Sequence, residues 1–83
     1  MKKYLVNIRL PSIGKSYDVY LPAGKLVGES TSLLIEIAES LTGGDYQGTE
    51  NSVLLDAESG MPLQVDITIY DAGVRNSSRL ILI

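Results

Sequence analysis

The stretch that decides the fold is Ile69-Tyr70-Asp71-Ala72-Gly73-Val74-Arg75-Asn76-Ser77-Ser78-Arg79-Leu80-Ile81-Leu82-Ile83. Residues 65–73, which overlap its first part, predict one helical turn that ends at Gly73, and a polar loop follows. Residues 79–83 predict a final strand without polar alternation, because only aliphatic residues follow Arg79. A strand that is apolar on both faces is typical of the centre of a sheet, and one of its faces must meet something other than the main core.

Two alternating segments near the N-terminus predict a hairpin. Residues 3–10 alternate between an apolar set and a second set that contains Leu5, Asn7 and Arg9, which is the period of a half-buried strand. Residues 11–15 predict a turn, and alternation resumes until Pro22, which cannot donate to a ladder. The two strands and their short link predict an antiparallel hairpin.

A helical pattern follows the hairpin. Its apolar stripe on a helical wheel consists of Val27, Leu34, Ile37, Ala38 and Leu41. Gly43-Gly44 predicts the end of the helix, whereas its start is open between a first turn that contains Gly28 and an N-cap at Ser30. Residues 42–51 are rich in turn formers and predict a loop.

The second half of the chain predicts a short strand over 52–56, a tight turn over 57–60 and a return strand over 61–63. Pro62 restricts the return strand to a sheet edge. If the final strand pairs beside the first strand, the two hairpins flank it and the helix packs across one face. This predicts a single domain over residues 1–83 of the α+β class, a β-grasp with a mixed sheet of four to five strands.

Composition excludes most catalytic and metal chemistry. The 83 residues carry a net charge of −3 and include no His, Cys, Trp or Phe. Without Cys there is no thiol nucleophile or thiolate metal ligand, and without His the usual general base near neutral pH is missing. The carboxylates match no EF-hand spacing. We therefore expect no enzyme activity, no cofactor and no metal, and the negative charge argues against nucleic-acid binding.

The predicted order and spacing of elements resemble ubiquitin-fold proteins. Residues 69–83 resemble the ubiquitin-like pattern of Asp, a small residue, Gly, an aliphatic residue, a polar loop and a final strand. Residues 53–63 resemble the strand–turn–strand of ubiquitin. Within that superfamily the chain is most similar to the YukD/EsaB-like proteins of Gram-positive type VII (WXG100) secretion systems. This resemblance implies a cytosolic accessory protein that binds or regulates the secretion machinery.

The C-terminus bears on covalent chemistry. Conjugated ubiquitins and sulfur carriers need a flexible tail that ends in Gly-Gly, because only Gly allows the narrow approach to the activating enzyme. Here the sequence ends at Ile83 within a predicted strand, and its one Gly-Gly pair, Gly43-Gly44, is internal. We therefore expect no conjugation, with a truncated ubiquitin-like or sulfur-carrier protein as an alternative.

The strands carry more apolar residues than one core can hold, and the remaining ones predict a protein-binding surface. If Leu80 and Leu82 face the helix, then Ile81 and Ile83 face outward, and if Val53 and Leu55 face inward, Leu54 faces outward. Ile13 at the hairpin tip and Leu5 would adjoin them, and Tyr20 and Tyr46 could add contacts. The predicted protein-binding residues are Leu54, Ile81, Ile83, Ile13 and Leu5.

Contiguous exposed apolar surface usually marks an interface. We therefore expect a protein partner, a component of the secretion machinery, and a homodimer through the same face is the alternative. The short apolar runs predict no direct membrane insertion, and no secretory signal follows the basic N-terminus, so a cytoplasmic location is expected.

Overall fold

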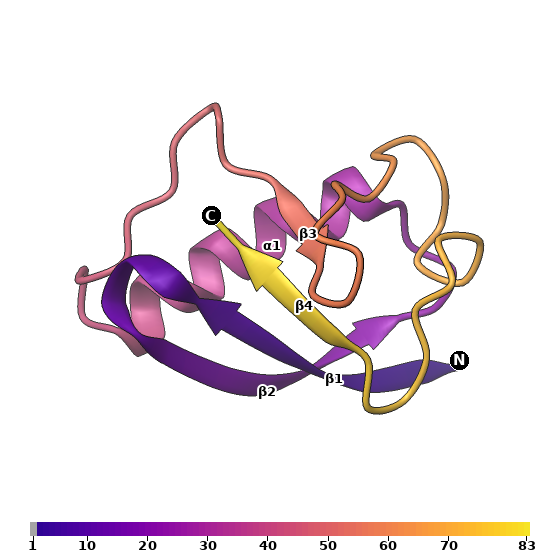
Figure 1. Ribbon diagram of the computed structural model, residues 1–83, viewed down its shortest axis with the longest axis horizontal. Helices are drawn as coiled ribbons and strands as arrows, with labels where there is room; N and C mark the ends of the chain where they lie inside the picture. The colour runs from indigo at the N-terminus through magenta and orange to yellow at the C-terminus, as the bar shows by residue number, and fades with distance from the viewer. Residues whose placement is uncertain (1) are drawn as a thin grey trace.

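The computed structural model describes residues 2–83 and shows a four-stranded sheet with one α-helix lying across one of its faces (Figure 1). The strands lie in the order β2-β1-β4-β3. The elements are β1 (Lys3–Leu10), a 3-10 helix (Pro11–Ile13), β2 (Lys15–Pro22), α1 (Val27–Leu41), β3 (Leu54–Asp56) and β4 (Arg79–Leu82). The predicted α+β ubiquitin-like β-grasp architecture is confirmed.

The hairpin of β1 and β2 confirms the alternation seen in the sequence. The strands pair antiparallel from Lys3 opposite Pro22 to Leu10 opposite Lys15. The turn between them ends at Gly14, whose φ of 65° is in the left-handed region that glycine tolerates. The side chains of β1 that enter the core are those of Tyr4, Val6, Ile8 and Leu10.

Strand β4 lies in the middle of the sheet. It runs parallel to β1, with Leu80 beside Ile8, and antiparallel to β3, with Leu82 beside Leu54. Leu80 and Leu82 are buried under the helix at 2% and 0% exposure. The central position accounts for the apolar residues on both faces of this strand.

Helix α1 packs on the sheet through Val27, Ser30, Leu34 and Ala38. It begins at Val27, and the Glu29 carboxylate accepts a hydrogen bond from the Leu26 N–H at 3.3 Å. At the other end, the N–H groups of Gly43 and Gly44 donate to the carbonyl oxygens of Ser40 and Glu39. This is the Schellman arrangement, so the predicted Gly43-Gly44 cap is confirmed. Leu41 is 55% exposed, contrary to its predicted place on the buried stripe.

The predicted return strand over 61–63 was wrong in its extent. A single bridge joins Leu55 to Pro62, with hydrogen bonds from the Asp56 N–H to the Met61 carbonyl and from the Leu63 N–H to the Leu54 carbonyl. Pro62 has no N–H, so it cannot extend the ladder. The sheet therefore has four strands.

The loop between α1 and β3 is anchored by an aromatic side chain. Tyr46 is 3% exposed and belongs to the hydrophobic core, so the prediction that it could contact a partner was wrong. The Tyr46 N–H donates to the Thr42 hydroxyl at 3.0 Å, and the Gly48 N–H donates to the Glu39 carboxylate at 3.1 Å. These bonds turn the loop back onto the helix and direct Tyr46 into the core.

Candidate protein-interaction surface

The side of the sheet away from α1 is the candidate surface, and we call it the outward sheet face. Alternation along each strand and the pairing register together place residues on this face. It comprises Leu5, Asn7 and Arg9 of β1, Ser16, Asp18 and Tyr20 of β2, Arg79 and Ile81 of β4, Leu55 of β3, and the flanking residues Val53 and Ile83.

Three of the five predicted binding residues lie on this face. Leu5 is 39% exposed and Ile83 is 52% exposed, while Ile81 is half-buried between its neighbours. Leu5 lies opposite Tyr20, which is 62% exposed, as predicted. Leu5 and Tyr20 are thus an exposed pair at one end of the sheet, and Ile83 lies beyond the last residue of β4.

Ile13 has a different environment from these three. It ends the 3-10 helix at the tip of the hairpin, where it is half-buried and packs against the core cluster. Only part of its side chain is therefore free for a partner.

The outward placement of Leu54 was wrong. Leu54 is 2% exposed and belongs to the hydrophobic core. It lies directly opposite Leu82 in the antiparallel pair of β3 and β4, and residues directly opposite each other project to the same face. Because Leu82 faces the helix, Leu54 must face it too.

Leu55 takes the outward position that Leu54 was expected to hold. It lies opposite Ile81 and is half-buried. Val53 and Ile83 exchange two backbone hydrogen bonds of 3.2 and 3.1 Å, so their side chains also share the outward face. The run Val53-Leu54-Leu55 contains no polar residue that would show which of its side chains face the core. Only the pairing with β4 determines their direction.

Residues 76 and 77, just before β4, form hydrogen bonds to Leu5 of β1, a residue of the outward sheet face. The Asn76 side-chain oxygen accepts a hydrogen bond from the Leu5 N–H at 2.9 Å, and the Ser77 N–H donates to the Leu5 carbonyl at 2.8 Å. Asn76 and Ser77 thus continue the pairing of β1 before β4 begins. Gly73, with φ of 87°, closes the preceding turn in the same Schellman arrangement as the helix end.

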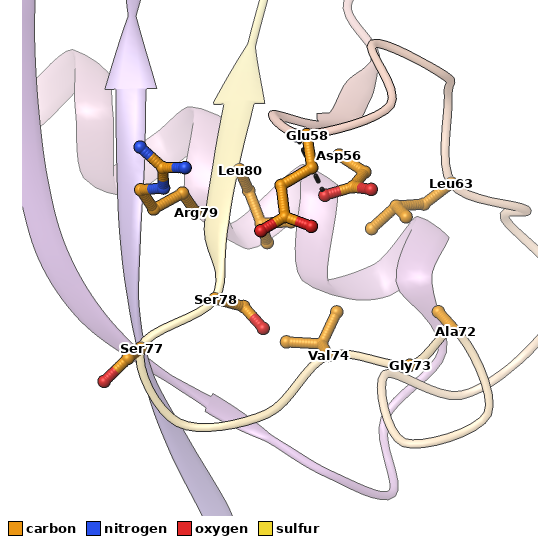
Figure 2. Close-up of a pocket in the computed structure, with 10 residues that line it drawn as sticks. All are labelled: Asp56, Glu58, Leu63, Ala72, Gly73, Val74, Ser77, Ser78, Arg79 and Leu80. Carbon is orange, nitrogen blue, oxygen red and sulfur yellow. Dashed lines mark hydrogen bonds between the residues drawn. The ribbon is translucent and has the colours of Figure 1, made fainter.

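A hollow of about 220 Å³ lies between this segment and the turn after β3. Figure 2 shows Asp56 and Glu58 on one side of it and Val74 and Ser78 on the other, with Ser77 pointing away. The Ser78 hydroxyl accepts from the Arg75 N–H at 2.9 Å, so it has a structural role. Within residues 2–83 no three metal-ligating side chains gather.

Helix α1 bears on the expectation that the chain does not insert into a membrane. Over the described part of the chain, no helix combines the length and the apolar character that a membrane span requires.

The comparisons with known proteins concern the fold. No protein-family model matches the sequence, and no curated protein does. Among solved structures, the EccD5 ubiquitin-like domain from Mycobacterium xenopi is similar with a TM-score of 0.83 at 17% identity, covering 100% of this chain and 94% of that chain. The ubiquitin-like domain of the type VII secretion protein ECCD1 from Mycobacterium tuberculosis gives a TM-score of 0.66 at 23% identity, covering 100% and 99%.

A third match is a chain of the ESX-5 inner membrane complex. It has a TM-score of 0.83 at 19% identity and covers 100% of this chain but 21% of that chain. Each identity is below the level at which a structural likeness carries more than the fold. Together with the observed strand order and the helix across one face, these matches show that the chain has the ubiquitin-like β-grasp fold.

Proposed function

We propose that this chain is a non-catalytic protein-interaction domain that binds a partner through the outward sheet face. The observation that carries the proposal is the group of adjacent aliphatic side chains of Leu55, Ile81 and Ile83 on the side of the sheet that α1 leaves uncovered. Leu5 lies on the same face but farther along the sheet, beyond Asn7 and Arg79. Covering the exposed half of one such side chain is worth about 1 kcal/mol. After the cost of association, several of them support a contact of moderate affinity.

The partner in this proposal belongs to a bacterial type VII secretion system. The resemblance of residues 69–83 to YukD/EsaB-like proteins supports this assignment. It is also supported by the structural likeness to the ubiquitin-like domain of ECCD1, whose name places it in such a system. The chain would then be a cytosolic accessory or regulatory component that docks on the membrane-bound machinery. The absence of His and Cys from the sequence supports a role without catalysis.

The test uses a light-activated crosslinker placed at Leu55 in the producing bacterium. The Leu55 side chain is half-buried on the outward sheet face, so a crosslinker at this position reaches a docked partner. We expect the crosslinked protein, identified by mass spectrometry, to be a component of the type VII secretion machinery. A crosslinked partner with no part in secretion would refute the secretion assignment.

The surface itself is tested with matched variants. Ile83→Asp places a charge on the outward sheet face, whereas Leu33→Asp changes a leucine of similar exposure, 47% against 52%, on α1. We expect Ile83→Asp to abolish the crosslink and Leu33→Asp to retain it. Equal crosslinking by both folded variants would refute the choice of surface. A stable dimer in sedimentation that Ile83→Asp dissociates would instead support the homodimer.

A further inference from the structure

We propose that the basic end of the outward sheet face recognises an acidic segment of the partner, whose carboxylates pair with Arg9 and Arg79 while an aliphatic side chain covers Ile81. This inference rests on the proposed function and names the chemistry of the partner. It is carried by a hollow of about 400 Å³ that Arg9, Lys15, Arg79, Asn7, Ser16 and Ile81 line.

The pairing register brings the two guanidinium groups to one place. In the parallel pair of β1 and β4, Arg79 lies beside Asn7 and Ile81 lies beside Arg9. Arg9 and Arg79 therefore project from diagonal positions of neighbouring strands on the same face. Ile81 lies beside Arg9 and two residues after Arg79 on the same face, so an aliphatic side chain adjoins both cations. This arrangement fits two carboxylates that flank an aliphatic residue.

In the described part of the chain, carboxylates lie near these cations without pairing with them. Asp18, on the same face, accepts a hydrogen bond from the Asn7 side-chain amide at 3.1 Å, and Asp56 and Glu58 line the adjacent hollow together with Arg79. Within residues 2–83, no ion pair or side-chain hydrogen bond engages Arg9, Lys15 or Arg79. Arg75 differs, because its guanidinium donates to two backbone carbonyls and stacks on the Tyr70 ring at 3.9 Å.

The rest of the molecule is acidic. Glu29, Glu36 and Glu39 lie along α1, which has no basic residue in its last turn, and the whole chain has a net charge of −3. The basic hollow is thus a positively charged site on a molecule whose net charge is negative. Like charges on neighbouring strands repel one another, and an anionic partner removes that repulsion when it docks. Complementary charge of this kind gives an interface its orientation and its association rate.

A protein segment fits this site better than a nucleic acid does. Nucleic-acid surfaces neutralise many phosphates in a row with clustered cations, whereas this hollow has three cations and an aliphatic floor that adjoins Leu55 and Ile83. Carboxylates next to aliphatic side chains match both halves of the surface.

The experiment titrates the isotopically labelled chain with a synthetic ten-residue peptide in which Asp residues flank two Leu residues. We expect saturable NMR shifts centred on the amides of Arg9, Arg79 and Ile81, lost when Asn replaces every Asp and lost at high salt, because screening weakens exposed charge pairs. Arg9→Glu with Arg79→Glu should weaken binding about tenfold. Lys2→Glu with Lys25→Glu changes the net charge equally and should leave it unchanged.

Several outcomes overturn the inference. They are equal weakening by both double variants, shifts centred elsewhere, no saturable shift, or tighter binding at these amides by a single-stranded oligonucleotide or an anionic vesicle. Circular dichroism confirms that each variant is folded. Because the crosslink at Leu55 is measured separately, a partner that crosslinks there equally to the parent and to the Arg9→Glu, Arg79→Glu variant refutes the acidic partner and leaves the proposed function standing. If the parent chain itself crosslinks to no component of the secretion machinery, the proposed function is refuted.

Discussion

The sharpest test of the structure compares two neighbouring leucines in β3. Leu54 is 2% exposed and packs beside Leu82, which is 0% exposed, whereas Leu55 is half-buried on the outward sheet face. Leu54→Ala removes buried methyl groups and leaves a cavity that the edge strand closes only partly, so we expect a loss of about 3 kcal/mol. Leu55→Ala removes groups that are already partly in water, and we expect about 1 kcal/mol or less.

The loss at Leu54 is large for a domain of this size. At about 0.05–0.15 kcal/mol per residue, 83 residues give a free energy of unfolding of about 4–12 kcal/mol. Urea unfolding followed by circular dichroism measures both variants. With a slope of about 1.5 kcal/mol/M, Leu54→Ala lowers the midpoint by about 2 M. Both variants keep the hydrogen bond from the Leu63 N–H to the Leu54 carbonyl, so the comparison isolates the side chains.

Two outcomes would refute the assignment of Leu54 to the core and of Leu55 to the outward sheet face. Equal midpoints for Leu54→Ala and Leu55→Ala, or a larger loss at Leu55, would mean that β3 presents the opposite face to the core. The pairing of Leu54 with Leu82 would then be wrong, and Leu54 would return to the outward sheet face.

Three further substitutions test other contacts by the same urea assay. Asn76→Ala removes the oxygen that accepts from the Leu5 N–H, so we expect a loss of about 1 kcal/mol; an unchanged midpoint would contradict it. Gly48→Ala forces a Cβ against the Ile35 side chain and should cost about 1–3 kcal/mol; an unchanged midpoint would contradict this close approach. Tyr46→Phe removes a buried hydroxyl without a hydrogen-bond partner in residues 2–83; stability should stay equal or rise by up to about 1 kcal/mol, and a clear loss would reveal a partner.

The sequence predicted the elements whose pattern is regular. Strand β1 alternates over its whole length, so its buried set followed directly from the period. The final strand carries aliphatic residues on both faces, and its central position follows from that composition alone. The Gly43-Gly44 cap was also predictable, because few residues other than glycine adopt the left-handed conformation that ends a helix in this way.

The wrong predictions concern segments in which the local sequence pattern does not determine which side chains face the core. The apolar run Val53-Leu54-Leu55, which leads into β3, fits either facing, and the choice depends on a partner strand that begins at Arg79. Tyr46 lies in a polar loop, and its burial follows from the bonds of the loop to Thr42 and Glu39. These contacts depend on packing between separate elements, which periodicity does not record.

The candidate site was predicted in part for the same reason. Ile81 and Ile83 are outward because Leu80 and Leu82 face the helix, and this alternation is local to one strand. The basic hollow escaped prediction, because Arg9 and Arg79 are far apart in the sequence and meet only through the parallel pairing of β1 with β4.

Hydrogen bonds outside strand β4 fix its register. A strand that is aliphatic on both faces has no hydrophobic pattern to fix its register, and a shift of one residue would exchange the core with the outward sheet face. Hydrogen bonds at both ends remove this ambiguity. Asn76 and Ser77 bind the backbone of Leu5 before the strand begins, and Val53 exchanges two bonds with Ile83 after it ends. Because these anchors lie outside β4, the register holds although the strand is aliphatic on both faces, with Leu80 and Leu82 in the core and Ile81 and Ile83 on the outward sheet face.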